Sequence, residues 1–110
     1  DARLTTMGRH FRLHPRLKII LGHDATENAR LEQMAGPLPV IAFTKEPGPT
    51  AVLRGPYDEN DLATVGRLMR RFSPKATAEN IEIRLRCDGR ETTWTAQSSA
   101  TADEIKSWTI

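Results

Sequence analysis

Residues 81–87, Ile-Glu-Ile-Arg-Leu-Arg-Cys, alternate apolar and charged side chains without a break. This period of two predicts a strand with one buried face. Asp88-Gly89 follows at once and is a strong signal for a two-residue hairpin turn. The chain is therefore expected to return as a second strand over about residues 90–96, so the fold must contain this antiparallel pair. The inward-facing residues of the first strand are Ile81, Ile83, Leu85 and Cys87.

The rest of the chain mixes strand and helix patterns. Asp24 followed by Glu27, and Asp58 before a longer periodic segment, are typical N-terminal caps of helices. Gly36-Pro37 and Ser73-Pro74 end the two helical segments. The predicted strands cover about residues 10–13, 17–21, 40–44, 50–54, 81–87 and 90–96, and the predicted helices cover about residues 24–35 and 58–72.

This order of elements, β-β-α-β-β-α-β-β, predicts an α+β fold with a mostly antiparallel sheet and two helices. The 110 residues are enough for a single domain, over residues 1–110, and too few for two. Residues 98–103 are small and polar and are expected to form a loop. Residues 106–110 are expected to form either a short last strand or a packed tail.

Composition narrows the class of protein. The apolar runs are far shorter than the roughly 20 residues that a membrane span needs, so no membrane association is expected. The single cysteine, Cys87, cannot form an internal disulfide, which favours a reducing compartment and predicts a cytoplasmic location. The sequence begins with Asp1 rather than Met, so we expect it to be the C-terminal part of a longer protein.

The 16 Lys and Arg residues only slightly outnumber the 14 Asp and Glu residues, but they are clustered. Segregated positive charge favours binding of a polyanion. A solvated surface without any ligand explains the charge alone equally well. The clusters consist of Arg3, Arg9, Arg12, Arg16 and Lys18 near the N-terminus; Arg67, Arg70, Arg71 and Lys75 in and after the second helix; and Arg84 and Arg86 in the alternating strand.

The second predicted helix, residues 58–72, separates apolar from basic side chains. At about 100° per residue its apolar residues share one side. Arg67, Arg70 and Arg71 fall close to the opposite side, where they would form a solvent-facing row of guanidinium groups suited to phosphates. The arginines of the 81–87 strand form a second row. If the two rows are neighbours in space, phosphate binding becomes the favoured interpretation.

The sequence contains no catalytic constellation. It lacks a phosphate-binding loop with its Lys, a Gly-rich dinucleotide fingerprint and a Gly-x-Ser-x-Gly elbow. His10 and His14 are four residues apart, but no third Cys or His ligand lies near them, so no metal site is predicted. Cys87 lies on the apolar side of its strand and is expected to be a buried, inert thiol. We therefore predict no catalytic residue and no cofactor for this chain.

Two segments have both a structural and a functional interpretation. Asn28 interrupts the inward stripe of the first predicted helix. Its amide either ties the helix to a neighbouring strand or loop, which is the favoured interpretation, or shapes a site at the helix N-terminus, where free N–H groups attract anions. Pro47-Gly48-Pro49-Thr50 is either a stiff turn or a backbone ledge that approaches a ligand closely.

Four segments follow one another in the order of a known family. Residues 11–28 contain a strand, a Leu-Gly-His-Asp turn and a helix with an Asn, where the family has a Val-Gly-Arg-Asn type of turn. Residues 47–54 are similar to a Pro-Gly-Ser-His segment and its strand. Residues 68–76 are similar to a helix ending in Tyr-Ser-Lys-Ala, and residues 81–85 match the strand after it. Together they resemble the NFACT RNA-binding domain.

The sequence departs from the family pattern at three places. The family's Asp-x-Trp-x-His element before the Pro-Gly turn is absent, Thr50 replaces the His of Pro-Gly-Ser-His, and His23 stands where Arg is usual. These departures resemble the divergent branch at the C-terminus of PP-loop tRNA thiolation proteins, which are thiouridylase-like. That resemblance implies an ATP-using PP-loop domain upstream of this chain and no ATP site within it.

The resemblance implies an RNA-binding domain with tRNA as the expected ligand. Because aromatic residues make up only 5% of the chain, recognition of backbone and shape is expected rather than single-strand readout. The alternative is a protein-interaction module that docks onto an upstream enzyme domain or another subunit. The residues expected to contact phosphates are Arg9, Arg12, Arg67, Arg70, Arg71, Lys75, Arg84 and Arg86, and the family-motif loop residues are His23, Asn28, Gly48 and Thr50.

Overall fold

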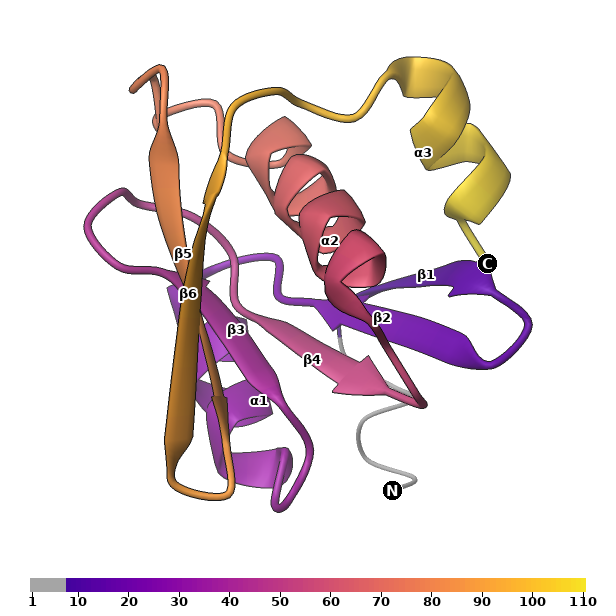
Figure 1. Ribbon diagram of the computed structural model, residues 1–110, viewed down its shortest axis with the longest axis vertical. Helices are drawn as coiled ribbons and strands as arrows, with labels where there is room; N and C mark the ends of the chain where they lie inside the picture. Colours follow the sequence, from indigo (N-terminus) through magenta and orange to yellow (C-terminus); the bar gives the residue numbers. More distant parts are fainter. Residues whose placement is uncertain (1–7) are drawn as a thin grey trace.

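The computed structural model describes residues 8–110, so Arg3 of the N-terminal basic cluster lies outside the described residues. The elements follow the predicted order, with one further helix near the C-terminus (Figure 1). The α+β class and the antiparallel sheet are confirmed. In chain order the elements are β1 Arg9–His14, β2 Leu17–Leu21, α1 Ala25–Met34, β3 Val40–Phe43, β4 Ala51–Arg54, α2 Glu59–Arg71, β5 Ile81–Cys87, β6 Arg90–Ala96 and α3 Ala102–Trp108.

The strands form one six-stranded sheet in the order β1-β2-β4-β3-β5-β6, and each neighbouring pair is antiparallel. The predicted hairpin is confirmed as the β5–β6 turn, with φ of 53° at Asp88 and 76° at Gly89. Both angles lie in the left-handed region that a tight hairpin turn of this kind requires. The β1–β2 hairpin forms the opposite edge of the sheet.

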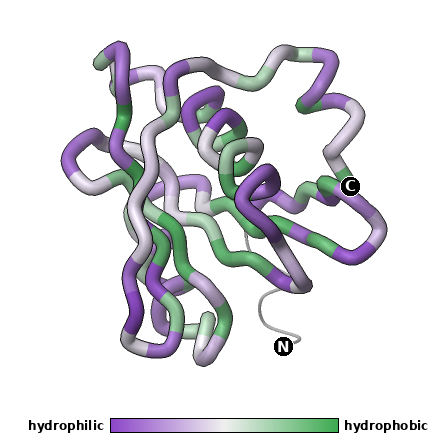
Figure 2. Tube along the Cα trace, in the orientation of Figure 1, coloured by the Kyte–Doolittle hydropathy of each residue, from purple (hydrophilic) through white to green (hydrophobic). Residues whose placement is uncertain are grey.

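Helices cover both faces of the sheet. α2 packs against the main hydrophobic cluster, to which β2 contributes Ile19 and Leu21. α1 packs over a smaller cluster that contains Ile20 and Leu31. Because successive residues of a strand face opposite sides, the two helices lie on opposite faces. Figure 1 shows α2 in front of the sheet and α1 behind it, and Figure 2 shows hydrophobic residues gathered along the strands between them.

α2 lies tightly against the β5–β6 hairpin. It begins with a reciprocal capping box between Asp58 and Asp61, as the cap signal at Asp58 predicts. A Cβ atom at Gly66 would lie 2.8 Å from Ile83 Cδ1 and 3.1 Å from Trp94 Nε1. A glycine at this position therefore lets the helix backbone approach the two strands closely.

α3 corrects the prediction for the C-terminal segment. Residues 98–101 form a loop, as expected, but the helix begins at Ala102, with a cap formed by Thr101 and Glu104. The expected strand or tail over residues 106–110 is mostly the end of that helix. Beyond it, Thr109 forms a bridge to Phe11 of β1. The helix is too short to show a clear period, so only its Thr-x-x-Glu cap could have indicated it.

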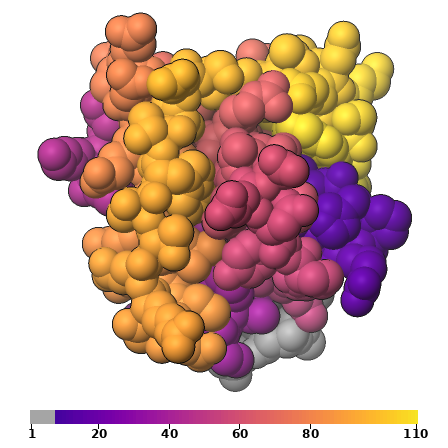
Figure 3. Space-filling model, in the orientation of Figure 1, coloured from indigo at the N-terminus to yellow at the C-terminus, as the bar shows by residue number. Residues whose placement is uncertain are grey.

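The three elements α2, α3 and β1 are neighbours on one side of the molecule. Figure 3 shows α2 between β6 on one flank and α3 and β1 on the other. Ile105 and Trp108 of α3 pack against the main cluster. Within residues 8–110, none of the helices is long and apolar enough to cross a membrane.

Candidate functional site

The two predicted rows of arginine lie on different faces of the sheet. Arg84 and Arg86 alternate along β5 with Ile83 and Leu85, which belong to the cluster beneath α2. The arginines of β5 therefore face away from α2. Arg86 pairs with Glu32 of α1 at 2.8 Å, as that placement requires. The sheet separates the two rows, so the condition for a joint phosphate-binding surface is not met.

Arg67 of α2 is engaged with α3 rather than facing solvent. Its guanidinium donates to both carboxylate oxygens of Glu104, one of them at 3.0 Å. This hydrogen bonding from Arg67 is the main reason why the pKa of Glu104 is lowered to about 2, and the backbone N–H of Thr101 lowers that pKa further. The periodicity of the sequence predicts solvent at this side of α2, but α3 lies there.

Arg70 is also used within the molecule. Its guanidinium donates to the carbonyl oxygens of Ala78, Glu79 and Ala96 at 2.8, 3.0 and 3.1 Å, respectively. It therefore fastens α2 to the end of β6 and to the segment that leads into β5. Arg71 is exposed. The solvent-facing row expected on α2 is wrong for Arg67 and Arg70, because other elements pack around them.

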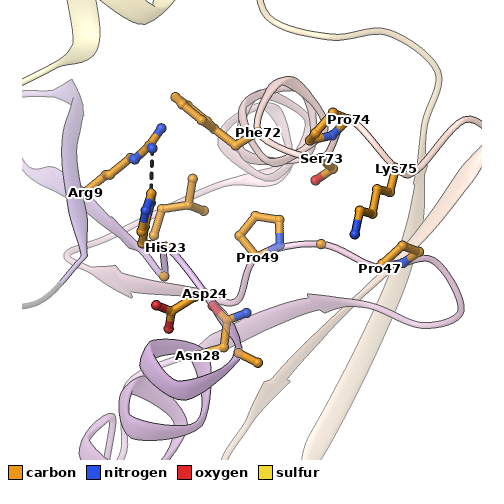
Figure 4. Close-up of a pocket in the computed structure, with 14 residues that line it drawn as sticks. Arg9, His23, Asp24, Asn28, Pro47, Pro49, Phe72, Ser73, Pro74 and Lys75 are labelled. Carbon is orange, nitrogen blue, oxygen red and sulfur yellow. Dashed lines mark hydrogen bonds between the residues drawn. The ribbon is translucent and has the colours of Figure 1, made fainter.

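Three of the four family-motif residues meet at a groove at one end of the sheet (Figure 4). The groove has a volume of about 480 Å³ and lies between three segments: the β2–α1 turn, the β3–β4 loop and the residues after α2. His23, Asn28 and Gly48 line it, together with the cationic side chains of Arg9 and Lys75. Residues far apart in the sequence therefore share one site.

Asn28 joins the wall of the groove to the sheet. Its Oδ1 accepts a hydrogen bond from the backbone N–H of Thr50 at 3.0 Å. The favoured interpretation of Asn28, an amide that ties the helix to a neighbouring strand or loop, is confirmed. A Cβ atom at Gly22 would lie only 1.9 Å from the same oxygen, so the β2–α1 turn needs glycine there. Thr50 itself is only 7% exposed and contributes through its backbone.

The β3–β4 loop forms the floor of the groove. Gly48 lies against the Phe43 ring, because a Cβ atom at this position would fall 2.5 Å from the ring and 3.0 Å from Ser73 Oγ. Ser73 is buried and donates its hydroxyl to the carbonyl oxygen of Met69. The loop between Pro47 and Pro49 is therefore packed directly onto the end of α2, as the interpretation of a stiff turn requires.

Arg9 is held in a fixed position over the groove. Its guanidinium carbon lies 4.7 Å from the centre of the Phe72 ring. On its other side the guanidinium donates to His23 Nδ1 at 3.1 Å, as the dashed line in Figure 4 shows. This contact requires Nδ1 to be the acceptor nitrogen of the imidazole. Phe72, which packs against the main cluster, thus also orients a cation at the site.

The charge of the groove is positive on two sides. Lys75 stands across the groove from Arg9 and is exposed. Asp24 lines the groove as well, but its carboxylate accepts the backbone N–H of Glu27 at 2.8 Å as the cap of α1. Glu27 likewise accepts the backbone N–H of His23 at 2.7 Å, so carboxylates already occupy N–H groups at this end of α1. The feature that favours an anionic group such as a phosphate is therefore the pair of cations.

The remaining candidate groups serve structural roles. Cys87 is half-buried rather than buried as expected, because it lies at the end of β5. Burial together with the neighbouring Asp88 raises the pKa of its thiol, so the thiolate needed for reactivity is disfavoured. His14 Nε2 lies 3.3 Å from Asp61 Oδ2 at the start of α2. In the part of the chain from Gly8 onward, no group of three or more His, Cys, Asp or Glu side chains could hold a metal ion.

Solved structures and a protein family were found that are similar to this chain. The C-terminal part of the fibronectin/fibrinogen-binding protein from Streptococcus suis is a similar solved structure, with a TM-score of 0.72 and 15% sequence identity. The match covers 94% of this chain and 49% of that chain, so this chain spans about half the length of that structure. At this identity the likeness shows the fold alone. The comparison with curated proteins found no significant match.

The sequence model of one family covers nearly all of the chain. The model of the NFACT protein RNA binding domain matches residues 8–109, which include every segment of the groove and the added helix α3. The chain therefore belongs to the family of NFACT protein RNA-binding domains.

Proposed function

We propose that this domain binds structured RNA, specifically tRNA, and that the groove contacts the sugar–phosphate backbone. Family membership implies RNA binding. The observation that carries the assignment to the groove is the convergence there of Arg9 and Lys75 with the family-motif residues. Within residues 8–110, neither cation forms an ion pair with a carboxylate. Both charges therefore remain available to phosphates.

The geometry favours backbone contacts over base stacking. The exposed face of Phe72 would be the natural platform for a base, but the guanidinium of Arg9 lies over this ring. The guanidinium is held there by His23, so it loses little conformational freedom when a phosphate binds. A planar guanidinium with free N–H groups can then donate two parallel hydrogen bonds to one phosphate.

A salt titration tests the proposal. Binding of fluorescently labelled tRNA to the domain is measured by anisotropy at several KCl concentrations. Because phosphate contacts release counterions, the affinity should fall steeply with salt. Lys75→Gln should weaken binding and reduce the log–log slope by about one.

Lys106→Gln is the matched control, because Lys106 is an exposed lysine in α3 and does not line the groove. It should leave the slope nearly unchanged. A salt-independent affinity for tRNA, or equal effects of Lys75→Gln and Lys106→Gln, would contradict the assignment to the groove. In the second case, the affinity for tRNA would depend only on the net charge of the domain and not on the position of the lysine.

We further propose that the domain works in the cytoplasm, beside an upstream PP-loop domain that uses ATP to thiolate tRNA. The support comes from the sequence: His23 and Thr50 depart from the general family pattern as in the divergent branch of PP-loop proteins. On this proposal the domain holds the tRNA and contributes no catalytic group. The alternative is a module that docks onto another protein domain, with Arg71, the exposed arginine at the end of α2, as a protein contact.

The coding sequence upstream of Asp1 provides the first check of this context, which requires a PP-loop domain there. The second check is the level of thionucleosides in tRNA, measured in cells that carry either the full-length protein or its Lys75→Gln variant. The variant should lower the thionucleoside level, because tRNA is held less well. Should Arg71→Glu separate the domain from its neighbour while tRNA affinity stays unchanged, the docking alternative is the better account.

A further inference from the structure

We infer that a second surface, on the face of the sheet opposite α2, also binds the RNA backbone. We call it the strand row, and it consists of Arg12 of β1, Lys18 of β2 and Arg54 of β4. Arg12 lies directly opposite Lys18, and Lys18 lies directly opposite Arg54 in the strand pairing. This inference rests on the proposed function and adds a second contact surface for the same RNA.

The placement of the row follows from the pattern of the strands. Lys18 is two residues from Ile20 on β2, and Arg54 is two residues from Val52 on β4. Ile20 and Val52 lie in the cluster beneath α1, so the basic residues share that face of the sheet. α1 has only ten residues, and in Figure 1 it lies behind the sheet, away from the tip of the β1–β2 hairpin. The helix thus covers the apolar pair, whereas in the basic row Arg12 is exposed and Lys18 and Arg54 are half-buried.

The three charges are close together. Neighbouring strands lie about 4.8 Å apart, so the row spans roughly 10 Å. Side chains directly opposite each other in an antiparallel pair have Cβ atoms about 5 Å apart, and like charges in such positions destabilise the sheet. The fold therefore bears a cost at this row, unless a counter-charge offsets it.

No counter-charge within the described part of the chain offsets that cost. The ion pairs among residues 8–110 join His14 to Asp61, Arg67 to Glu104, and Arg86 to Glu32, and none includes the strand row. Arg12 donates one hydrogen bond to the carbonyl oxygen of Pro15 at 3.0 Å, which leaves its other N–H groups available. Three adjacent cations without a counter-charge among residues 8–110 suit a polyanion. Because the chain belongs to a family of RNA-binding domains, that polyanion is RNA.

The row and the groove engage the same RNA from two sides of the β1–β2 hairpin. Arg9, which borders the groove, and Arg12, in the row, are three residues apart on β1, or about 10 Å along the strand. Three residues along a strand reverse the face, so the two arginines project to opposite faces. Thr109 bridges to Phe11 at this edge, so a folded RNA about as wide as a duplex contacts both arginines by passing over the C-terminal residues.

The test combines RNA affinity with stability, because a structural role and a binding role predict opposite outcomes. The double variant Lys18→Gln/Arg54→Gln removes two like charges from adjacent strands. It should leave the melting temperature unchanged or raise it at low salt, and it should reduce the log–log salt slope for tRNA by about two. Arg90→Gln/Lys106→Gln removes the same charge from exposed positions outside the row and the groove, and it should change neither quantity much.

Three outcomes are decisive. A reduced slope with unchanged or higher stability supports the strand row as an RNA contact. If the row variant behaves like the Arg90→Gln/Lys106→Gln control while Lys75→Gln still weakens binding, the row is overturned and the proposed groove stands. If the unmodified domain binds tRNA with no salt dependence, the proposed function fails and the row fails with it.

Discussion

Residues of the same type have different roles in this domain, even where they are adjacent in the sequence. Arg70 and Arg71 are adjacent at the end of α2, and their sequence pattern gives no reason to separate them. The structure gives Arg70 three carbonyl partners from the segments around β5 and β6 and leaves Arg71 exposed. Arg70 therefore acts on the stability of the fold, and only Arg71 is available to a partner from this pair.

Arg70→Ala should lower the free energy of unfolding by about 1–3 kcal/mol, because hydrogen bonds from a charged donor to half-buried carbonyls are lost. Arg71→Ala is the matched control and should change the free energy by no more than about 0.5 kcal/mol, as is usual for exposed positions. Urea unfolding followed by circular dichroism measures both. Equal stabilities of the two variants would show that the three hydrogen bonds of Arg70 contribute nothing.

At the scale of elements, α3 depends on a small number of contacts. It packs on the main cluster through Ile105 and Trp108, and the pair of Arg67 with Glu104 connects it to α2. The carboxyl of Glu104 has a pKa of about 2 in the folded protein, below its ordinary value of 4.5. A lowered pKa means that the ionised carboxylate stabilises the folded state.

The docking of α3 should therefore be fully stabilised above about pH 4.5 and should lose this contribution as the pH falls from 4.5 toward 2. In Arg67→Gln the pKa of Glu104 should rise toward its ordinary value, while the cap at Thr101 still keeps it somewhat low. NMR titration of the Glu104 carboxyl measures this shift. Lys106→Gln, in the same helix, should leave the pKa where it is; a Glu104 pKa unaffected by loss of Arg67 would refute the explanation.

At the scale of the whole molecule, the groove and the strand row are two parts of one proposed RNA surface that share β1 and β2 but no residue. Perturbations at sites without common partners usually add. Lys75→Gln combined with Lys18→Gln/Arg54→Gln should therefore change the logarithm of the tRNA dissociation constant by the sum of the separate changes. Fluorescence anisotropy at one fixed salt concentration measures the dissociation constants that this comparison needs. A combined effect no larger than that of Lys75→Gln alone would show that the two surfaces do not bind the RNA together.

Much of the fold could be predicted because its signals are local. The alternation over residues 81–87, the Asp88-Gly89 turn and the caps at Asp24 and Asp58 each depend on a few neighbouring residues, and each is confirmed. α3 escaped prediction because seven residues give too few turns for a period to appear. Of the site, the family-motif residues His23, Asn28 and Gly48 were identified as a group by resemblance, and the structure brings them together.

By itself, the sequence determined the six strands, the first two helices, the antiparallel hairpins and the family likeness, since side-chain period and turn chemistry act over short distances. Only the tertiary structure decided which arginines share a surface. A strand's period assigns each residue to one of two sides, but the strand order and the side covered by each helix follow from burying apolar surface between distant segments. That packing placed Arg84 and Arg86 away from α2, engaged Arg67 and Arg70 internally, and aligned Arg12, Lys18 and Arg54 on one face.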